Sequence, residues 1–359
     1  MDMIIIIHVI NKNNLSNMHL EHVRYDLSQG FPDEWGTSLL ERDIIEKMCK
    51  DEQFDLVVNA TWGFLECTHP ITNETSEKFK ITKDLVMNHG VRNILFFNFV
   101  DPLYEESTWY DVLDACKEKI GEHNIRTVGF VDSNKFKQDL PVAFWAIYNE
   151  HAFIRYDEKD LIPSKLENIY LCYNRKPTFH RTWLHEQFEK HGLLAKGIFT
   201  LGNQDPAKVI LINKDKKTLP FANDNIHGNL NIPNDTLSVG PLDAWNSSFL
   251  IIVTETDHNM NTAVPFLSEK IWKPLIGMRP FVCLGDKGTI KSLKEAGFET
   301  FNEFFGFDKD DLTVDDVTNL VKRYKGDPIQ DYESLRDKLI HNRKRFFEYA
   351  REQKRALGL

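Results

Sequence analysis

The sequence is poor in the features that mark secreted, membrane and disulfide-rich proteins. Near the N-terminus only residues 3–7 form an uninterrupted apolar run, which is too short for a signal peptide or a membrane span. Five cysteines occur in 359 residues, widely scattered and without a Cys-x-x-Cys pair. Such cysteines favour reduced thiols in a reducing compartment. We therefore expect a cytoplasmic protein, in the host cytoplasm if the chain is viral.

Three motifs of nucleotide and acyl chemistry are also missing. No Gly-x-Gly-x-x-Gly follows the first apolar run, and neither a Gly-x-x-x-x-Gly-Lys-Ser/Thr loop nor a Gly-x-Ser-x-Gly elbow occurs. These absences disfavour a nicotinamide-dependent dehydrogenase, a P-loop nucleotidase and an α/β-hydrolase. The sequence also has no internal repeat and no low-complexity tract.

What the chain does have is a globular composition with an acidic balance. Hydrophobic residues make up 42% and aromatic residues 12%, which is enough for sizeable cores. The length favours two domains. The formal net charge of −10 disfavours a general nucleic-acid-binding surface, because phosphate binding requires clustered lysine and arginine.

The N-terminal half alternates apolar runs with amphipathic segments. Strands are predicted at 3–10, 55–60, 93–100 and 126–131, and helices at 72–89, 108–123 and 141–153. This alternation predicts an α/β domain with a parallel sheet and helices on both faces, a doubly wound, Rossmann-like unit over residues 1–155. The polar stretch 155–166 is predicted to be a linker.

The same alternation begins again in the C-terminal half. Strands are predicted at 168–173, 197–201, 249–254 and 280–284, and helices at 180–190, 268–276, 289–295 and 314–324. Residues 205–237 are predicted to be irregular. A second doubly wound, Rossmann-like domain is therefore expected over residues 167–330. Ligands bind beyond the carboxyl ends of the strands in such sheets, so a cleft between the two domains suits a two-substrate reaction.

The most informative segment follows the predicted strand 249–254. Glu255 comes directly after this strand, and Ser268 is a suitable N-cap for the next helix. Glu269 and Lys270 then fall in the first helical turn, where free N–H groups and partial positive charge attract anions. We interpret this turn as a diphosphate site, with Glu269 as a partner for a ribose or sugar hydroxyl.

Further basic residues lie near the same strand ends. Arg175 and Arg181 flank the loop after the strand 168–173, and Lys273 lies on the helix that begins at Ser268. The planar guanidinium group of arginine binds two phosphate oxygens at once. We regard all three as candidates for phosphate binding; the alternative is that they are solvated charges on helix surfaces.

This pattern resembles the donor-binding motif of the alpha-1,3-fucosyltransferases. In that family a strand ending in Phe-Glu-Asn leads to Thr-Glu-Lys, a short helix, and a Pro-Val strand that ends in glycine. Glu255 matches the glutamate after the strand, residues 268–270 match Thr-Glu-Lys, and residues 280–285 match the closing strand. Glu255 and Ser268 are therefore candidate donor-binding residues. Thr256 replaces the family's asparagine, so the donor sugar stays open and fucose is not assumed.

The resemblance implies the GT-B fold, in which two Rossmann-like domains face each other across a cleft. It implies that Lys270 and Arg181 contact the donor diphosphate, and that Glu269 contacts the ribose or the sugar. It further implies that the C-terminal helix, expected over residues 331–359, packs back on the N-terminal domain. The chain is also similar to uncharacterised glycosyltransferases of tailed phages, some of which modify hydroxymethylated bases of DNA.

A transfer that inverts the sugar requires a base to remove the proton of the acceptor hydroxyl. Residues 127–136 resemble the family segment that carries this base, and Asp132 lies nearest to its carboxylate. Asp101 and Glu66 follow two other predicted strands and are alternatives on position alone.

No metal ion and no cofactor other than the nucleotide-sugar substrate are expected. Asp308-Lys309-Asp310 imitates a metal-binding Asp-x-Asp motif, but it does not follow a predicted buried strand, so we interpret it as the polar approach to a helix. The pairs His19/His22 and His180/His185 lack a third ligand at a suitable spacing.

The acceptor is not defined by the sequence. A glycan, a lipid-linked sugar and a hydroxymethylated base in DNA all remain open, and no integral membrane segment is expected. From Ser334 to Leu359 the chain has eight basic and three acidic residues. This basic face of the last helix is either solvated or in contact with acceptor phosphates.

These patterns together predict a metal-independent glycosyltransferase that uses a nucleotide-diphosphate sugar and a hydroxyl acceptor. One alternative is a non-catalytic module of the same fold that binds a nucleotide or a sugar. A second alternative is a sugar-nucleotide epimerase, which converts the donor without any acceptor.

Overall fold

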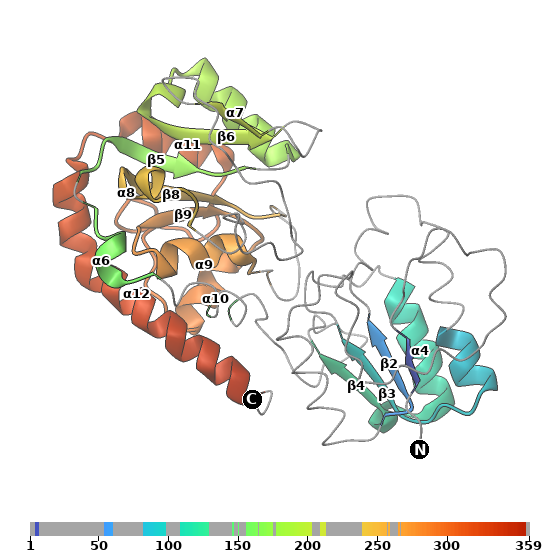
Figure 1. Ribbon diagram of the computed structural model, residues 1–359. Helices are drawn as coiled ribbons and strands as arrows, with labels where there is room; N and C mark the ends of the chain where they lie inside the picture. The colour runs from blue at the N-terminus through green and yellow to red at the C-terminus, as the bar shows by residue number, and fades with distance from the viewer. Residues whose placement is uncertain are drawn as a thin grey trace. The chain divides into compact units, whose positions relative to one another are not determined.

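The chain divides into two compact α/β units in the computed structural model (Figure 1). One unit comprises Met1–Phe144 with Lys354–Leu359, and the other comprises Trp145–Gln353. The structure describes residues 4–6, 54–59, 82–97, 108–128, 146, 150, 156–163, 165–174, 177–202, 209–212, 239–256, 258, 265 and 267–356.

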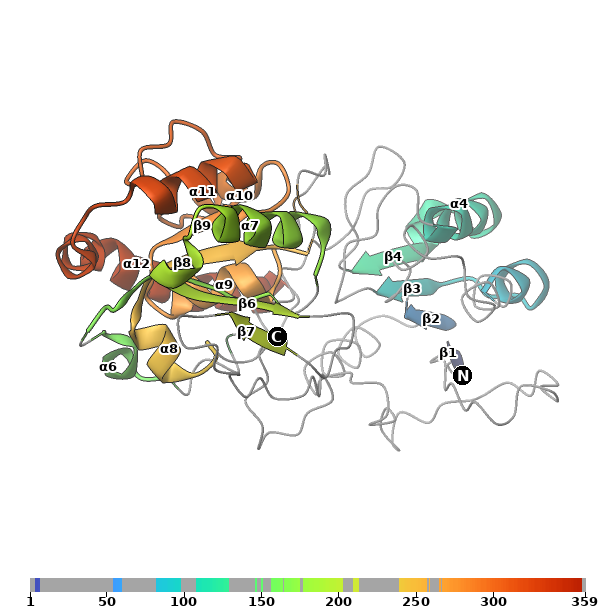
Figure 2. The same cartoon turned by 90° about the horizontal axis from the view of Figure 1, so that it is seen from above.

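The first unit contains a four-stranded, fully parallel sheet whose strands lie side by side in chain order (Figure 2). The strands are β1 (Ile4–Ile6), β2 (Leu56–Asn59), β3 (Ile94–Phe97) and β4 (Ile125–Val128). The described helical segments beside them are residues 82–88, α4 (Thr108–Ile120) and the 3-10 turn η3 (Glu122–Asn124). Strand and helix side chains form one apolar cluster that includes Leu56, Leu85, Ile94, Phe96, Val112 and Leu113.

The order of these strands differs from the predicted doubly wound sheet. Each described strand lies beside the one that precedes it, so the order does not reverse among them. Right-handed connections then place residues 82–88 and α4 on the same face. The parallel α/β arrangement predicted for this half is confirmed, whereas a reversal is not seen in the strands that the structure describes.

The second unit is built on a five-stranded sheet with the order β7-β6-β5-β8-β9. Four strands run parallel, namely β5 (Asn168–Cys172), β6 (Gly197–Gly202), β8 (Ser248–Thr254) and β9 (Phe281–Leu284). The edge strand β7 (Val209–Ile212) pairs antiparallel with β6. The helices of the unit are α6 (Glu158–Leu161), α7 (Phe179–Lys190), the 3-10 turn η4 (Leu194–Lys196), α8 (Leu242–Asn246), α9 (Glu269–Ile276), α10 (Thr289–Glu295), α11 (Val314–Arg323) and α12 (Pro328–Ala356).

The chain changes direction across this sheet between β5 and β8. From β5 it passes through α7 to β6 on one side, and from β8 it passes through α9 to β9 on the other. Right-handed connections therefore place α7 and α9 on opposite faces. α11 packs beside α7, and α12 packs against α9, where Trp272 contacts Phe346 and Tyr349. The predicted doubly wound arrangement is present in this unit.

Two predictions for this half need correction. The stretch 205–237, expected to be irregular, contributes β7, whose apolar residues Val209–Ile212 extend the sheet by antiparallel pairing. The stretch 155–166, expected to be a linker, is packed on the second unit: Leu161 is fully buried. The carbonyl oxygen of Leu161 accepts a 2.7 Å hydrogen bond from Arg279, which holds this segment against α8 and α9.

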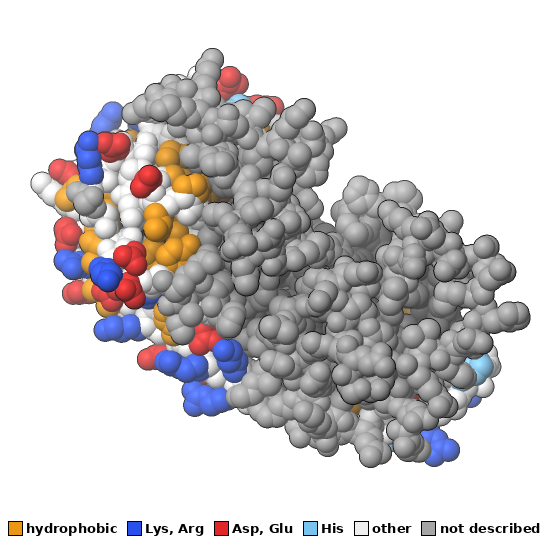
Figure 3. Space-filling view, in the orientation of Figure 1, with side chains coloured by type: hydrophobic (Ala, Val, Ile, Leu, Met, Phe, Trp, Pro, Cys, Tyr) orange, Lys and Arg blue, Asp and Glu red, His pale blue; other side chains and the backbone are white. Residues whose placement is uncertain are grey.

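Helix α12 lies along one side of the second unit (Figure 1). Its buried residues include Leu335, Leu339 and Phe346, and its Tyr349 contacts Trp272 and Phe298 of the second unit. The predicted packing of this helix on the N-terminal domain stays a prediction. Among its basic residues, Arg336, Lys338, Arg343 and Arg345 pair with acceptors of the same unit. Figure 3 shows acidic and basic side chains mixed along this edge of the molecule.

Gly277, at the end of α9, packs closely against the ring of Trp245. A Cβ atom at Gly277 would lie 2.3 Å from Cζ2 of Trp245, a fully buried ring whose Nε1 donates to the Gly277 carbonyl oxygen at 2.9 Å. We expect Gly277→Ala to lower the free energy of unfolding by about 1–3 kcal/mol in urea denaturation, because overpacking shifts the ring.

The matched test of this prediction is a double-mutant cycle. Trp245→Leu removes the ring that the new methyl group meets, so the two substitutions together should cost less than the sum of their separate effects. Additive effects would show that Gly277 and Trp245 are not in the contact described.

Candidate functional site

The site lies where the strand order of the second sheet reverses. The carboxyl ends of β5 and β8 lie next to each other there, and the chain continues from them toward α7 and α9. In open α/β sheets ligands bind outside the strand ends at such a reversal. Strand β8 is buried along its whole length, which fixes the position of Glu255 directly after it.

The N-terminus of α9 is capped by Ser268, as the sequence predicts. The Ser268 hydroxyl accepts a 3.2 Å hydrogen bond from the backbone N–H of Lys270. Serine at this position satisfies one of the helix N–H groups that have no partner within the helix. The helix itself forms because Ile271, Trp272 and Leu275 recur on one buried face.

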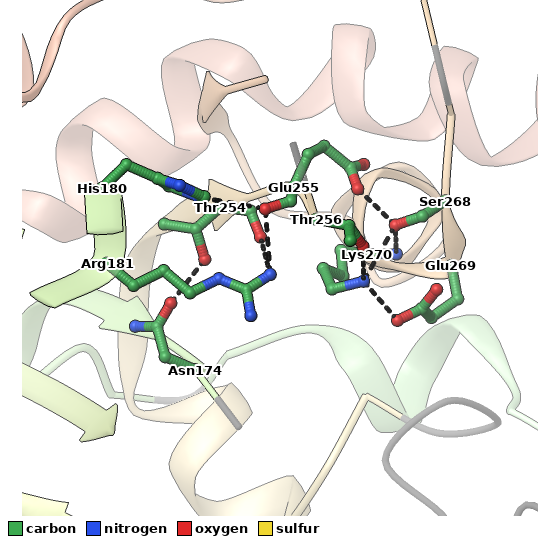
Figure 4. A network of polar contacts seen from close by, with 9 residues as sticks. All are labelled: Asn174, His180, Arg181, Thr254, Glu255, Thr256, Ser268, Glu269 and Lys270. Carbon is green, nitrogen blue, oxygen red and sulfur yellow. Dashed lines mark hydrogen bonds and ion pairs between the residues drawn. The ribbon is translucent and has the colours of Figure 1, made fainter. Parts of the chain in front are cut away.

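The ammonium group of Lys270 is surrounded by three acceptors (Figure 4). Its Nζ lies 2.6 Å from Oε1 of Glu269, 3.2 Å from Oγ of Ser268 and 3.3 Å from Oγ1 of Thr256. A quarter of the Lys270 side chain is exposed. Lysine has three N–H donors, so the described contacts use all of them, and an incoming anion would replace one or more of these acceptors.

Glu269 is an ionised partner of two lysines. Burial disfavours its charge, but the ammonium groups of Lys270 and Lys273 outweigh burial and hold the pKa of Glu269 at about 2. Lys273 is itself only 9% exposed, so the alternative of a solvated surface lysine is wrong. A contact between Glu269 and a ribose or sugar hydroxyl stays a prediction.

Glu255 is a buried carboxyl group in the same cluster. It is 2% exposed, and its Oε2 accepts a short hydrogen bond from the Ser268 hydroxyl (Figure 4). Burial raises the pKa of Glu255 to about 7, although the nearby charges of Lys270 and Arg181 act in the opposite direction. Glu255 therefore changes its charge near neutral pH.

Arg181 reaches this cluster from α7. One of its terminal nitrogens donates 2.9 Å hydrogen bonds to the carbonyl oxygens of Thr254 and Glu255, at the end of β8. The side chain is 4% exposed. The structure thus brings Arg181 beside Glu255 as a buried positive charge, while its predicted contact with a phosphate stays a prediction.

Two histidines near the cluster were not recognised as part of it from the sequence. His180 and His258 have ring centroids 5.2 Å apart. His180 Nε2 donates to the Glu255 carbonyl oxygen at 3.0 Å, and His258 Nδ1 donates to the Gly285 carbonyl oxygen at 3.2 Å. Burial, helped by Arg181 and His258, lowers the pKa of His180 to about 3, so this ring is neutral. Their only signal in the sequence is proximity to Arg181 and Glu255.

Arg279, which follows α9, has a structural role: it bonds to several buried carbonyl groups. It is fully buried and donates to the carbonyl oxygens of Leu161, Trp245, Gly277, Met278 and Ser248 and to Oδ1 of Asn246. Its guanidinium group also stacks over the ring of Tyr332. A buried arginine with this many acceptors holds α6, α8 and α9 together.

The remaining predicted site residues lie outside the described residues: Arg175, Asp132, Asp101 and Glu66. Within the described part of the chain, no group of three or more His, Cys, Asp and Glu side chains is arranged to hold a metal ion. No helix in that part combines the length and the apolar character that crossing a bilayer requires.

The described site thus comprises one helix N-terminus, three cationic side chains, an ionised carboxylate and a carboxyl group that titrates near neutrality. Such a set suits a ligand with several negative charges. Comparisons of the chain with protein-family models, with curated proteins and with solved structures find no match in any of the three.

Proposed function

We propose that the chain is a glycosyltransferase that moves a sugar from a nucleotide-diphosphate sugar to a hydroxyl acceptor. The observation that supports this most is the gathering of Arg181, Lys270 and Lys273 at the end of β8, around the capped N-terminus of α9. A diphosphate is the common biological ligand that matches positive charge and free N–H groups at a helix N-terminus.

The proposed role of this cluster is to stabilise the leaving group. When the bond between the sugar C1 and the phosphate oxygen breaks, its electron pair stays on the nucleoside diphosphate, whose negative charge grows. Lys270 and the helix N-terminus are positioned in advance for that charge, which is how fixed positive groups lower a barrier. Arg181 and Lys273 add to the positive potential from buried positions.

The acceptor half of the reaction rests on the N-terminal unit in this proposal. The acceptor hydroxyl oxygen forms the new bond to C1, and a carboxylate takes its proton, with Asp132 as the first candidate and Asp101 and Glu66 as alternatives. The two-domain GT-B arrangement and the absence of a catalytic metal belong to the same proposal. The resemblance of the same residues to the fucosyltransferase donor motif also supports it.

A panel of nucleotide sugars tests this function. We expect release of nucleoside diphosphate from one uridine, guanosine, adenosine or thymidine diphosphate sugar, increased by an acceptor such as hydroxymethylated DNA or a glycan and unaffected by EDTA. Binding without release would support the non-catalytic module, and conversion of the donor without acceptor would support the epimerase. If no member of the panel binds or reacts, the proposal is wrong.

The salt dependence of acceptor binding then tests whether DNA is the acceptor. Binding of DNA should weaken steeply between low and physiological salt, because the contacts release counterions from the phosphates. A response that is flat with salt would remove DNA as the acceptor and leave a glycan or a lipid-linked sugar.

A further inference from the structure

The hydrogen bonds of Ser268 determine which oxygen of Glu255 carries a proton. A serine hydroxyl has one donor and two acceptor positions. Oγ of Ser268 accepts from the backbone N–H of Lys270 and from its ammonium group, each at 3.2 Å. Both acceptor positions are occupied, so the single Ser268 proton points to Oε2 of Glu255.

Because Oε2 of Glu255 accepts that proton, a protonated Glu255 carries its own proton on Oε1. Oε1 is buried and has no hydrogen-bond partner among the residues that the structure describes. A negative charge at this position is poorly solvated. The hydrogen bond from Ser268 to Oε2 is compatible with both the carboxylate and the protonated group, and burial of Oε1 favours the protonated group.

The charge state of Glu255 changes the net charge of the whole cluster. Charged and titratable groups surround this cluster on every packed element: Glu269, Lys270 and Lys273 on α9, His180 and Arg181 on α7, His258 in the loop after β8, and Cys283 and Asp286 at the end of β9. With Glu255 neutral, the cations near α9 exceed the one ionised glutamate there. With Glu255 ionised, part of that excess disappears.

We propose that Glu255 takes up a proton when the α9 N-terminus binds a pyrophosphate group, so that proton and diphosphate bind together. This inference rests on the proposed function, because it assumes that the site binds a diphosphate. An anion beside Glu255 disfavours the carboxylate and favours the acid, and by linkage the proton favours the anion equally. Glu255 acts through Ser268 and Lys270 and is thus a positioning residue rather than a catalytic one.

The direction of the pH effect follows from the free protein. Burial raises the pKa of Glu255 to about 7, so the acid predominates below pH 7 and the carboxylate above it. The bound anion raises this pKa further. The affinity for the diphosphate should therefore be constant below about pH 6.5 and fall above pH 7, approaching about tenfold per pH unit where one proton is taken up.

Calorimetric titrations at pH 6, 7, 8 and 9 test this coupling. The probes are a nucleotide sugar that binds in the donor panel, whose diphosphate diester keeps a constant charge over this range, and inorganic pyrophosphate. Titrations at pH 8 in two buffers with different ionisation enthalpies count the protons, and we expect an uptake that approaches one per ligand.

Glu255→Gln is the matched variant. Its amide oxygen still accepts from Ser268 and its NH₂ group replaces the protonated oxygen, so it mimics the acid permanently. We expect its affinity to match wild type at pH 6 and to exceed it at pH 9, with no proton uptake from the nucleotide sugar. Inorganic pyrophosphate changes its own protonation state over this pH range. The proton uptake measured with Glu255→Gln therefore gives the contribution of the probe alone.

The outcomes separate this inference from the proposed function. Binding by wild type with no proton uptake at pH 8, or with the same pH profile as a folded Glu255→Gln protein, overturns the inference and leaves the function standing. Absence of binding by either probe at every pH contradicts both. If the variant does not fold, the proton count on wild type decides alone.

Discussion

Replacing Lys270 by alanine is expected to lower kcat/KM for the nucleotide sugar by about 10²–10³-fold, because one preorganised donor to the departing charge is lost. The ammonium group lies at the capped end of α9, held by Glu269, Ser268 and Thr256. The measurement is the steady-state release of nucleoside diphosphate with the donor identified in the panel.

The control for this variant is another lysine that the cluster does not include. Lys291 on α10 is 71% exposed and faces Glu295 one turn later, so Lys291→Ala should leave turnover unchanged. Lys270→Ala removes the nearest cation of Glu269, and this loss can destabilise the fold. The unfolding midpoint of the variant is therefore measured in parallel. A folded Lys270→Ala protein with normal turnover would contradict the assignment of this turn.

Exchanging Arg279 for leucine is expected to lower the free energy of unfolding by about 3–5 kcal/mol, since several buried carbonyl groups lose their partner at about 1–3 kcal/mol each. The guanidinium group donates to Leu161 at 2.7 Å, to Met278 at 3.0 Å and to Ser248 at 3.1 Å. Burial lowers its pKa to about 10, so it remains protonated near neutral pH.

Urea denaturation of the full chain measures this effect. Arg279→Lys keeps the charge but not the planar set of donors, so it should retain only part of the stability. Arg336 on α12 is the control: it is 45% exposed and meets Glu333 at 3.4 Å, so Arg336→Leu should change stability by less than about 0.5 kcal/mol. A loss below about 1 kcal/mol for Arg279→Leu would contradict its structural role.

The elements of the second unit were largely predictable because their signals are local. Ser268 before an amphipathic run predicts a capped helix, and the structure has α9 at Glu269–Ile276 with that cap. The run Thr289–Glu295, with Gly297 shortly after it, likewise forms α10 with the predicted bounds. Periodicity and capping depend on neighbours in the chain, so the sequence carries them directly.

Features that depend on distant contacts were not predictable. The stretch 155–166 is polar like a linker, yet Leu161 is buried and its carbonyl oxygen accepts a hydrogen bond from Arg279, far along the chain. β7 is a strand because β6 offers a free edge for pairing. Burial of Lys273 depends on the packing of α9, which helical position alone does not reveal.

The sequence predicted several residues of the candidate site but not the hydrogen bonds and ring contacts that join them. Lys270, Glu255 and Arg181 were each expected near a donor diphosphate, and the structure brings all three to the end of β8. The sequence did not predict that Ser268 links Glu255 to Lys270, nor that the rings of His258 and His180 lie close together. These links depend on the side-chain directions at two strand ends, which spacing in the chain does not determine.

Direct titration of nucleoside diphosphates into the protein tests the central claim, that the N-terminus of α9 binds a pyrophosphate group. At pH 6.5 and low salt we predict saturable binding of one diphosphate per chain, weakened at least tenfold by Lys270→Ala and unchanged by Lys291→Ala. Equal affinity in wild type and a folded Lys270→Ala protein would contradict the claim, as would the absence of binding by every diphosphate in the panel.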